Sequence, residues 1–346
     1  MIKNNFFNKL KQSNKVFIIA EIGSGHLGKI SRAFRLIDIA SKAGADAVKF
    51  QTFKAEEMAT LNNKYNKIEK YPFNLFNRWR DLEFSFENYK KVINYCKKKK
   101  IIFMTSVFGT ESLNFTKKFN SIIKISSFDL NYFELLDEAI KARKPILIST
   151  GISNEKMIEK LINFFKAKKF KNYALMHCGS CYPLRFEDAN LNYIKKLNKK
   201  FPNNPIGYSD HTLNISSSIA AVALGAKIIE KHITISQKDK FPDAFFSLEY
   251  KNLDLMVRNI RELESSLGKE KKIISKSIMQ NKKAMRSYYA VNFLKKNTII
   301  KKGMFKALRP RVSGAIEIHE FYNFLNKKLN RNIKKYGLLK KNYIDY

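Results

Sequence analysis

The sequence predicts an α/β fold, a (β/α)₈ barrel followed by a small β-rich module, and three observations carry this prediction. Short apolar or β-branched runs alternate with amphipathic helical patterns between residues 16 and 268. Such alternation is typical of parallel strands joined by crossover helices. There are eight of these runs in about 250 residues, which is the number of strands and the length of a (β/α)₈ barrel. The alternation stops near residue 268.

Each predicted strand is a short apolar segment, and helical spacing fills the intervals between strands. The strands are expected at residues 16–22, 47–50, 101–105, 122–125, 145–150, 173–178, 205–208 and 226–233. In the first interval, apolar residues recur at i, i+3, i+4 and i+7, at Ala33, Leu36, Ile37 and Ala40. The last helix repeats this spacing from Leu253 to Ile260.

The predicted domains are a basic N-terminal extension at 1–15, a barrel at 16–268, a polar linker at 269–285 and a small module at 286–346. In this module, residues 288–294 and the turn near Gly303 predict short strands. A module of about sixty residues can bury only a small hydrophobic core and is marginally stable alone, so we expect it to pack against another surface.

Composition narrows the classes of protein. The 346 residues carry 66 Lys and Arg against 30 Asp and Glu, a formal net charge of +36, with 45% hydrophobic residues and three cysteines. A chain this apolar can bury a sizeable core, which excludes general disorder. No apolar run approaches the ~20 residues of a membrane span, and Glu21 interrupts the first apolar segment before it could serve as a signal peptide. We therefore expect a cytoplasmic protein with no membrane partner.

Two other functions remain as alternatives. The positive charge favours a non-catalytic polyanion-binding protein, but the lysines are scattered and no nucleic-acid reading motif accompanies them, so no specific nucleic-acid partner is expected. Residues 23–28 spell G-x-G-x-x-G after a strand, which favours an NADP-dependent oxidoreductase. Against this, the acid expected near the end of the second strand is replaced by Lys49, Phe50 and Gln51.

Polar and ionisable residues follow nearly every predicted strand, at the end of the barrel where enzymes of this fold build their active sites. His211 and His232, on neighbouring strands, are candidate ligands for one divalent metal ion. Lys49 and Lys124 bring cations into the barrel mouth, and nearby serine hydroxyls supply donors suited to a phosphate. The residues grouped in this way are Glu21, Lys49, Gln51, Lys124, Ser127, Asp129, Ser149, Ser209, His211 and His232.

Several motifs, taken together and in order, closely resemble the bacterial sialic acid synthase family, whose members make N-acetylneuraminic, legionaminic and pseudaminic acids. They are Phe-Ile-Ile-Ala-Glu-Ile-Gly at 17–23, Gly-Ala-Asp-Ala-Val-Lys-Phe-Gln-Thr-Phe-Lys at 44–54, Ile-Ser-Thr-Gly at 148–151, Tyr-Ser-Asp-His-Thr at 208–212, Ala-Leu-Gly-Ala-Lys-Ile-Ile-Glu-Lys-His at 223–232 and Pro-Asp-Ala-Phe-Phe-Ser-Leu-Glu at 242–249. The tail, with Leu-Arg-Pro at 308–310, resembles the antifreeze-like (SAF) domain of this family.

The resemblance implies a synthase that condenses phosphoenolpyruvate with an open-chain N-acetylated hexosamine, N-acetylmannosamine or a 2,4-diacetamido-trideoxyhexose. Water attacks the former enol carbon and phosphate leaves by C–O cleavage. The implied cofactor is a divalent metal, Mn²⁺ or Mg²⁺, held by His211 and His232, and the implied assembly is a domain-swapped homodimer. The implied catalytic residues are Glu21, Asp129, His211 and His232. Phosphoenolpyruvate would be bound by Lys49, Lys124, Ser127, Ser149, Ser180 and Ser209. The sugar would be bound by Gln51, Tyr182, Asp243 and, from the partner chain, Arg309.

Some positions depart from the family pattern. Asp129 stands where neuraminate synthases commonly have Glu, and Ser180 where they often have Asn. Phe128 and the 242–248 segment look more like pseudaminic acid synthases. Arg311 replaces a glycine of the usual cap turn, which removes freedom at positive φ. The segment 53–82 contains Tyr65, Tyr71, Phe73, Phe76 and Trp79 and is expected to be either a lid over the sugar or a surface loop with its own small cluster.

Overall fold

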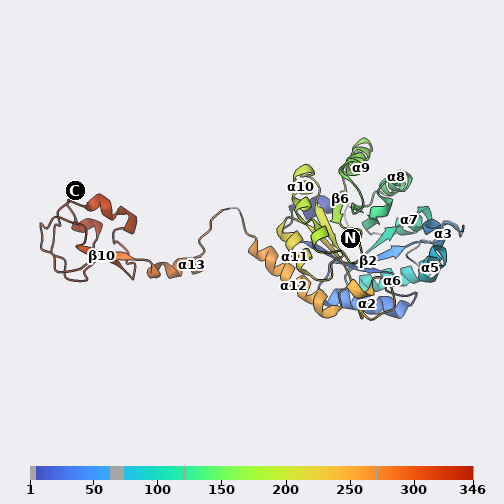
Figure 1. Cartoon of the computed structure of the whole chain (residues 1–346), viewed down its shortest axis with the longest axis horizontal. Coiled ribbons are helices and arrows are strands. Elements are labelled where there is room, and N and C mark those ends of the chain that lie inside the picture. The colour runs from blue at the N-terminus through green and yellow to red at the C-terminus, as the bar shows by residue number, and fades with distance from the viewer. Residues whose placement is uncertain (1–4, 63–73, 120–121, 270, 346) are drawn as a thin grey trace. The chain divides into compact units, whose positions relative to one another are not determined.

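The computed structural model describes residues 5–62, 74–119, 122–269 and 271–345. The chain divides into two compact units, Met1–Gly268 and Lys269–Tyr346 (Figure 1). In the described residues, no helix is both long enough and apolar enough to cross a membrane.

The first unit is a closed parallel barrel, which confirms the predicted fold. Each strand pairs in parallel with the next, and β1 pairs with β8 to close the ring. Its strands are β1 Phe17–Gly23, β2 Ala47–Thr52, β3 Ile102–Val107, β4 Ile122–Ile125, β5 Ile146–Ser149, β6 Tyr173–Cys178, β7 Ile206–Asp210 and β8 Ile228–His232.

Helices surround the barrel (Figure 1). They are α2 Ile30–Lys42, α3 Ala55–Met58, α5 Leu75–Leu82, α6 Phe86–Lys98, α7 Thr110–Thr116, α8 Phe133–Lys141, α9 Glu155–Ala167, α10 Asn192–Lys200, α11 Ser216–Ala223 and α12 Tyr250–Ser266. The four apolar residues that predicted the first helix are all buried on one face of α2. They join strand residues such as Ile18 and Val48 in the main core between barrel and helices.

A second, smaller core fills the barrel interior. Its members come from alternate positions of the strands, because successive side chains of a strand point to opposite faces. They include Phe17, Met104, Leu147 and Met176. The helix α1, Phe6–Gln12, adds Phe7, which is 1% exposed. Part of the segment 1–15 is therefore packed against the N-terminal end of the barrel.

The second unit contains β9, Ser287–Ala290, paired antiparallel with β10, Phe305–Leu308. Isolated bridges, such as Leu294 with Ile333, connect the rest of this unit. Its own core is small and apolar, formed by Ala290, Leu294, Ile300, Phe305, Ile316, Phe321, Phe324, Leu329, Ile333, Leu339 and Ile344. A short helix, α13 Lys276–Gln280, lies within the segment expected to be a linker.

Candidate active site

A ring of mostly polar side chains lies inside the barrel, one from each strand. They are at the inward positions that follow the apolar interior core along the strands, toward the carboxyl ends. All are buried. The members, from β1 to β8, are Glu21, Lys49, Ser106, Lys124, Ser149, Cys178, Ser209 and Glu230.

Two lysines and two glutamates form one ionic network in this ring. Lys49 Nζ lies 2.7 Å from Glu21 Oε2, 3.1 Å from Ser106 Oγ and 3.8 Å from Glu230 Oε1. Lys124 Nζ lies 3.4 Å from the same Glu230 oxygen. The network therefore places two ammonium groups side by side at the bottom of the mouth, as binding of a doubly charged anion requires.

Burial and neighbouring charges set the protonation of these groups. Burial, helped by Glu230, raises the pKa of Glu21 to about 7, although Lys49 opposes this shift. Burial favours the neutral form of Glu230, but the positive charges of Lys124 and Lys49 outweigh the effect of burial. The pKa of Glu230 therefore lies below its usual range. Burial lowers the pKa of Lys124, and Glu230 only partly compensates. Glu21 is thus poised to take up or release a proton near neutral pH.

His211 and His232 meet at the mouth, with ring centroids 5.5 Å apart. His211 Nδ1 donates to the Gly179 carbonyl oxygen at 2.8 Å, which leaves the Nε2 lone pair free to bind a ligand. Burial lowers the pKa of His211 and lowers that of His232 well below its usual range, so both imidazoles are neutral. Neutral imidazoles of this kind are the nitrogen ligands that a divalent transition metal requires.

Two histidines alone are too few ligands to hold a metal ion. Asp243 Oδ2 lies 3.8 Å from His232 Nδ1, and burial raises the pKa of Asp243 to about 6. Among the described residues, no group of three or more His, Cys, Asp or Glu is arranged to hold a metal ion. A metal at the two histidines would leave positions for water or substrate, as catalytic sites do.

Serine hydroxyls from three successive loops or strands come together beside the lysines. Ser127 Oγ and Ser180 Oγ lie 2.9 Å apart. A Cβ at Gly151 would lie 2.2 Å from Ser180 Oγ and 2.8 Å from Cys178 Sγ, so a glycine there allows this approach. Ser149 is buried and its hydroxyl interacts with the Cys178 thiol, a weak hydrogen-bond partner that a ligand oxygen can replace.

Residues assigned to the sugar, and Asp129, which is assigned to catalysis, differ in their contacts. Gln51 Nε2 donates to Glu21 Oε1 at 3.2 Å, and the Tyr182 ring lies 4.5 Å from the His211 ring, so both border the ring or the histidines. The contacts of Asp129 and Arg309 lie elsewhere. Ser126 Oγ donates to the Asp129 carboxylate, and Arg309 Nε donates to the Ala284 carbonyl oxygen within the second unit.

Some polar residues at the strand ends face outward and do not belong to the site. Asp210 and Lys231 form a buried ion pair at 3.1 Å, and Asp210 also accepts from Ser218 Oγ of α11. His177 lies 2.9 Å from the Ala189 carbonyl oxygen. Conversely, Glu230 and Ser106 are polar strand-end residues to which the sequence assigned no role, and both belong to the ring. Side chains alternate between the two faces of a strand, so counting in steps of two from an apolar interior residue would have distinguished inward-facing from outward-facing polar residues.

The glycine pattern at 23–28 serves a turn after β1. Gly23 has a φ of +53°, and a Cβ at Gly25 would lie 2.9 Å from the Ile22 carbonyl oxygen. His26 is buried, with its ring 4.3 Å from that of Phe84. The strands form a closed barrel and not an open sheet, so the interpretation of this glycine pattern as the fingerprint of a dinucleotide-binding fold is wrong.

The predicted lid lies partly outside the described residues, because Tyr65, Tyr71 and Phe73 fall within 63–73. The described residues on either side of 63–73 are held by hydrogen bonds. The Glu57 carboxylate accepts hydrogen bonds from the backbone N–H of Glu111 and Ser112 at the start of α7. The backbone N–H of Ala55 donates to Glu83 Oε1 at 2.6 Å. The lid itself stays a prediction.

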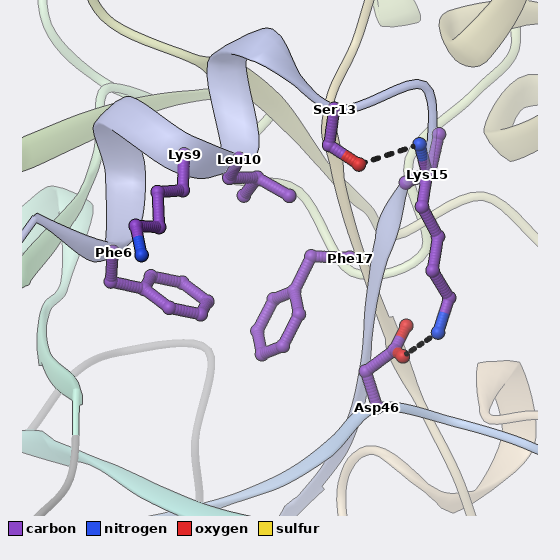
Figure 2. Close-up of a pocket in the computed structure, with 8 residues that line it drawn as sticks. Phe6, Lys9, Leu10, Ser13, Lys15, Phe17 and Asp46 are labelled. Atoms are coloured by element: carbon purple, nitrogen blue, oxygen red, sulfur yellow. Dashed lines mark hydrogen bonds and ion pairs between the residues drawn. The ribbon is translucent and has the colours of Figure 1, made fainter. Parts of the chain in front are cut away.

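A pocket of about 470 Å³ lies at the opposite end of the barrel, between α1 and the start of β1. Figure 2 shows the side chains of Phe6, Leu10 and Phe17 around it, with the Lys15–Asp46 ion pair at 2.7 Å on one side. None of the predicted site residues lines this pocket.

Comparison with known proteins decides the family. Residues 36–272 match the model of the NeuB family. The chain belongs to the NeuB family. It is 33% identical to a pseudaminic acid synthase of Campylobacter jejuni over 325 residues, covering 92% of this chain and 94% of that protein. It is 34% identical to an N,N'-diacetyllegionaminic acid synthase of the same species, covering 94% and 99%.

The solved structure of a sialic acid synthetase has the same fold. The N-acetylneuraminic acid synthetase of Leptospira borgpetersenii, crystallised in complex with citrate, superposes with a TM-score of 0.71 at 34% identity. The match covers 78% of this chain and 91% of that one.

Proposed function

We propose that the chain is a nonulosonic acid synthase that condenses phosphoenolpyruvate with an open-chain N-acetylated hexosamine and releases phosphate. Membership of the NeuB family and the synthase names of the relatives support this reaction class. The single observation that carries it is the juxtaposition at one barrel mouth of two buried ammonium groups, Lys49 and Lys124, with two neutral histidines.

Phosphoenolpyruvate binds at the lysines in this proposal. Its phosphate and carboxylate take charge-assisted hydrogen bonds from Lys49 and Lys124. Hydroxyl groups from the neighbouring strands and loops complete the site, at Ser127, Ser149, Ser180 and Ser209. Anchoring both charged ends fixes the enol carbon in the mouth, where it faces the acceptor.

A divalent metal, Mn²⁺ or Mg²⁺, fits the two imidazoles, because His211 Nε2 is free and its Nδ1–H is held by a backbone carbonyl. Bound there, such a metal supplies Lewis-acid polarisation of the sugar aldehyde. The protein holds that aldehyde next to the enol carbon through Gln51, Tyr182 and Asp243.

Glu21 and Asp129 are the proposed proton carriers. Glu21 has a pKa of about 7 and accepts a hydrogen bond from Gln51, so it can hold a proton at the boundary between the two substrates. Burial also raises the pKa of Asp129, against the lowering effect of Ser126. Water then adds to the former enol carbon, and phosphate leaves with the bridging oxygen.

The acceptor that we propose is a 2,4-diacetamido-trideoxyhexose in preference to N-acetylmannosamine. Phe128, after β4, is 58% exposed, and Phe245, after β8, is 50% exposed. Both follow barrel strands on the side of the mouth, where apolar rings suit a sugar that carries a methyl group in place of a hydroxymethyl group.

The second unit has the proposed role of an antifreeze-like cap domain in a cytoplasmic, domain-swapped homodimer. Its core is small, as expected for a module that functions against another surface. Arg309 would then reach the sugar of the partner chain.

A panel of acceptors tests the proposal. The purified protein is incubated with phosphoenolpyruvate, Mn²⁺ and either N-acetylmannosamine or each 2,4-diacetamido-trideoxyhexose, and products are identified by mass spectrometry. We expect a nine-carbon 2-keto acid, formed fastest from a trideoxyhexose. Absence of any nine-carbon acid contradicts the function, and a preference for N-acetylmannosamine contradicts the acceptor assignment.

A further inference from the structure

Glu230 is the member of the polar ring whose carboxylate lies near both lysines. It lies on β8, four strands away from β4 in the closed barrel, so its side chain crosses the interior toward Lys124. One carboxylate oxygen, Oε1, accepts from Ser209 Oγ at 2.9 Å and lies 3.4 Å from Lys124 Nζ and 3.8 Å from Lys49 Nζ. The residue is 3% exposed.

The two lysines depend on Glu230 to different degrees. Lys49 has a closer carboxylate, Glu21 at 2.7 Å, and a hydroxyl partner, Ser106 at 3.1 Å. For Lys124, the ion pair and the side-chain hydrogen bond given by the described residues both lead to Glu230 Oε1. A buried ammonium group is costly without a counter-anion, so Glu230 supplies the counter-anion of Lys124 while the site is empty, and a bound phosphate can take over that part.

The same carboxylate competes with the substrate. Glu230 lies near both lysine ammonium groups, so an arriving phosphate finds cations whose charge is already partly neutralised. Glu230 Oε2 is buried without a hydrogen-bond partner among the described residues. This second carboxylate oxygen is negatively charged, as a phosphate oxygen is, and the two would repel each other. In a medium of low effective dielectric constant, one such charge strongly alters anion affinity.

We propose that Glu230 is the internal counter-anion of the phosphate site, a positioning residue that presents Lys124 to phosphoenolpyruvate and weakens the grip on the released phosphate. The assignment rests on the proposed function. It goes beyond that function in giving Glu230 a role in product release, through the lysines and without contact to the reacting carbon.

The test compares Glu230→Gln with wild type by calorimetric titration of inorganic phosphate, which requires no turnover. Glutamine keeps the size of the side chain and an acceptor for Ser209 and Lys124, but removes the charge. We expect the variant to bind phosphate about tenfold or more tightly. In steady-state assays we expect a lower kcat, a lower KM for phosphoenolpyruvate and stronger inhibition by phosphate.

Two further variants separate this role from others. Glu230→Asp keeps the charge and should bind phosphate with nearly wild-type affinity. Glu264→Gln changes the net charge equally at the other end of the barrel, where Glu264 accepts from the backbone of Val16, and should leave phosphate affinity unchanged. Equal or weaker phosphate binding by Glu230→Gln overturns the inference, because a purely structural role predicts loss of the lysine site. Condensation by the wild type, measured separately, tests the proposed function itself.

Discussion

At the scale of single residues, the proposed reaction depends on the two neutral histidines at the mouth. His211→Ala removes this imidazole and its hydrogen bond to the carbonyl oxygen of Gly179, which is half-buried. We expect synthase activity to fall about a hundredfold or more. Circular dichroism should show an unchanged fold.

The control for this variant is His319→Ala, in the second unit, where the histidine is exposed and belongs to no proposed site. It should retain full activity. Unchanged turnover of His211→Ala in the presence of Mn²⁺ would remove the metal assignment.

A second prediction at this scale concerns His26. Burial, with a smaller contribution from Arg32, lowers its pKa from 6.5 to about 4. The folded state therefore disfavours the charged imidazole. The stability contributed by neutral His26 is fully present above pH 6.5 and is lost as the pH falls toward 4.

Urea unfolding of wild type and His26→Gln at about pH 7.5 and about pH 5 measures this effect. Between these conditions the wild type should lose about 2 kcal/mol more unfolding free energy than the variant. An identical pH dependence of the two proteins would show that His26 is not buried as described.

At the scale of elements, α1 closes the N-terminal end of the barrel. Phe7 belongs to the interior apolar cluster that contains Phe17 and Met104. Phe7→Ala should lower the unfolding free energy by about 3 kcal/mol, because it opens a cavity in this core. Phe6→Ala, on the same helix but half-buried beside the pocket of Figure 2, should cost about 1 kcal/mol. Equal losses would contradict the placement of Phe7.

Strands and helices of the barrel could be predicted because each carries a strong period, as in α2 with its four buried apolar residues. The boundaries shifted by one or two residues, since strand ends such as Gln51 and Thr52 are polar. The helix α1 lies in a short basic segment where Phe7 alone is fully buried, too weak a signal for a sequence pattern.

The sequence predicted that the candidate site lies at the strand ends. It did not predict which strand-end side chains point into the barrel and which point outward. Lys49, Lys124 and Ser209 were found because charged or hydroxyl residues at apolar strand ends are conspicuous. Asp210 and Lys231 share that signal and yet pair outside the barrel. The residue type of Glu230 does not reveal its proposed role, because that role depends on a contact with Lys124, which is 106 positions away in the chain.

At the scale of the whole molecule, the proposed swapped dimer makes a distinctive prediction. His211→Ala and Arg309→Ala should each be inactive alone, because one damages the barrel and the other the cap. When the two proteins are unfolded and refolded together, mixed dimers should contain one intact site, and about a quarter of the wild-type activity should return. Absence of recovery, with dimers demonstrated by light scattering, would place Arg309 in its own subunit's site or outside the site.

The central claim is that phosphoenolpyruvate reacts at this barrel mouth with loss of phosphate by C–O cleavage. The most direct measurement uses phosphoenolpyruvate with heavy oxygen in the bridging position, together with the acceptor sugar and Mn²⁺. We expect the heavy oxygen to appear in the released phosphate, and only when the sugar is present. Heavy oxygen retained in the organic product, or phosphate release that does not depend on the sugar, would contradict it.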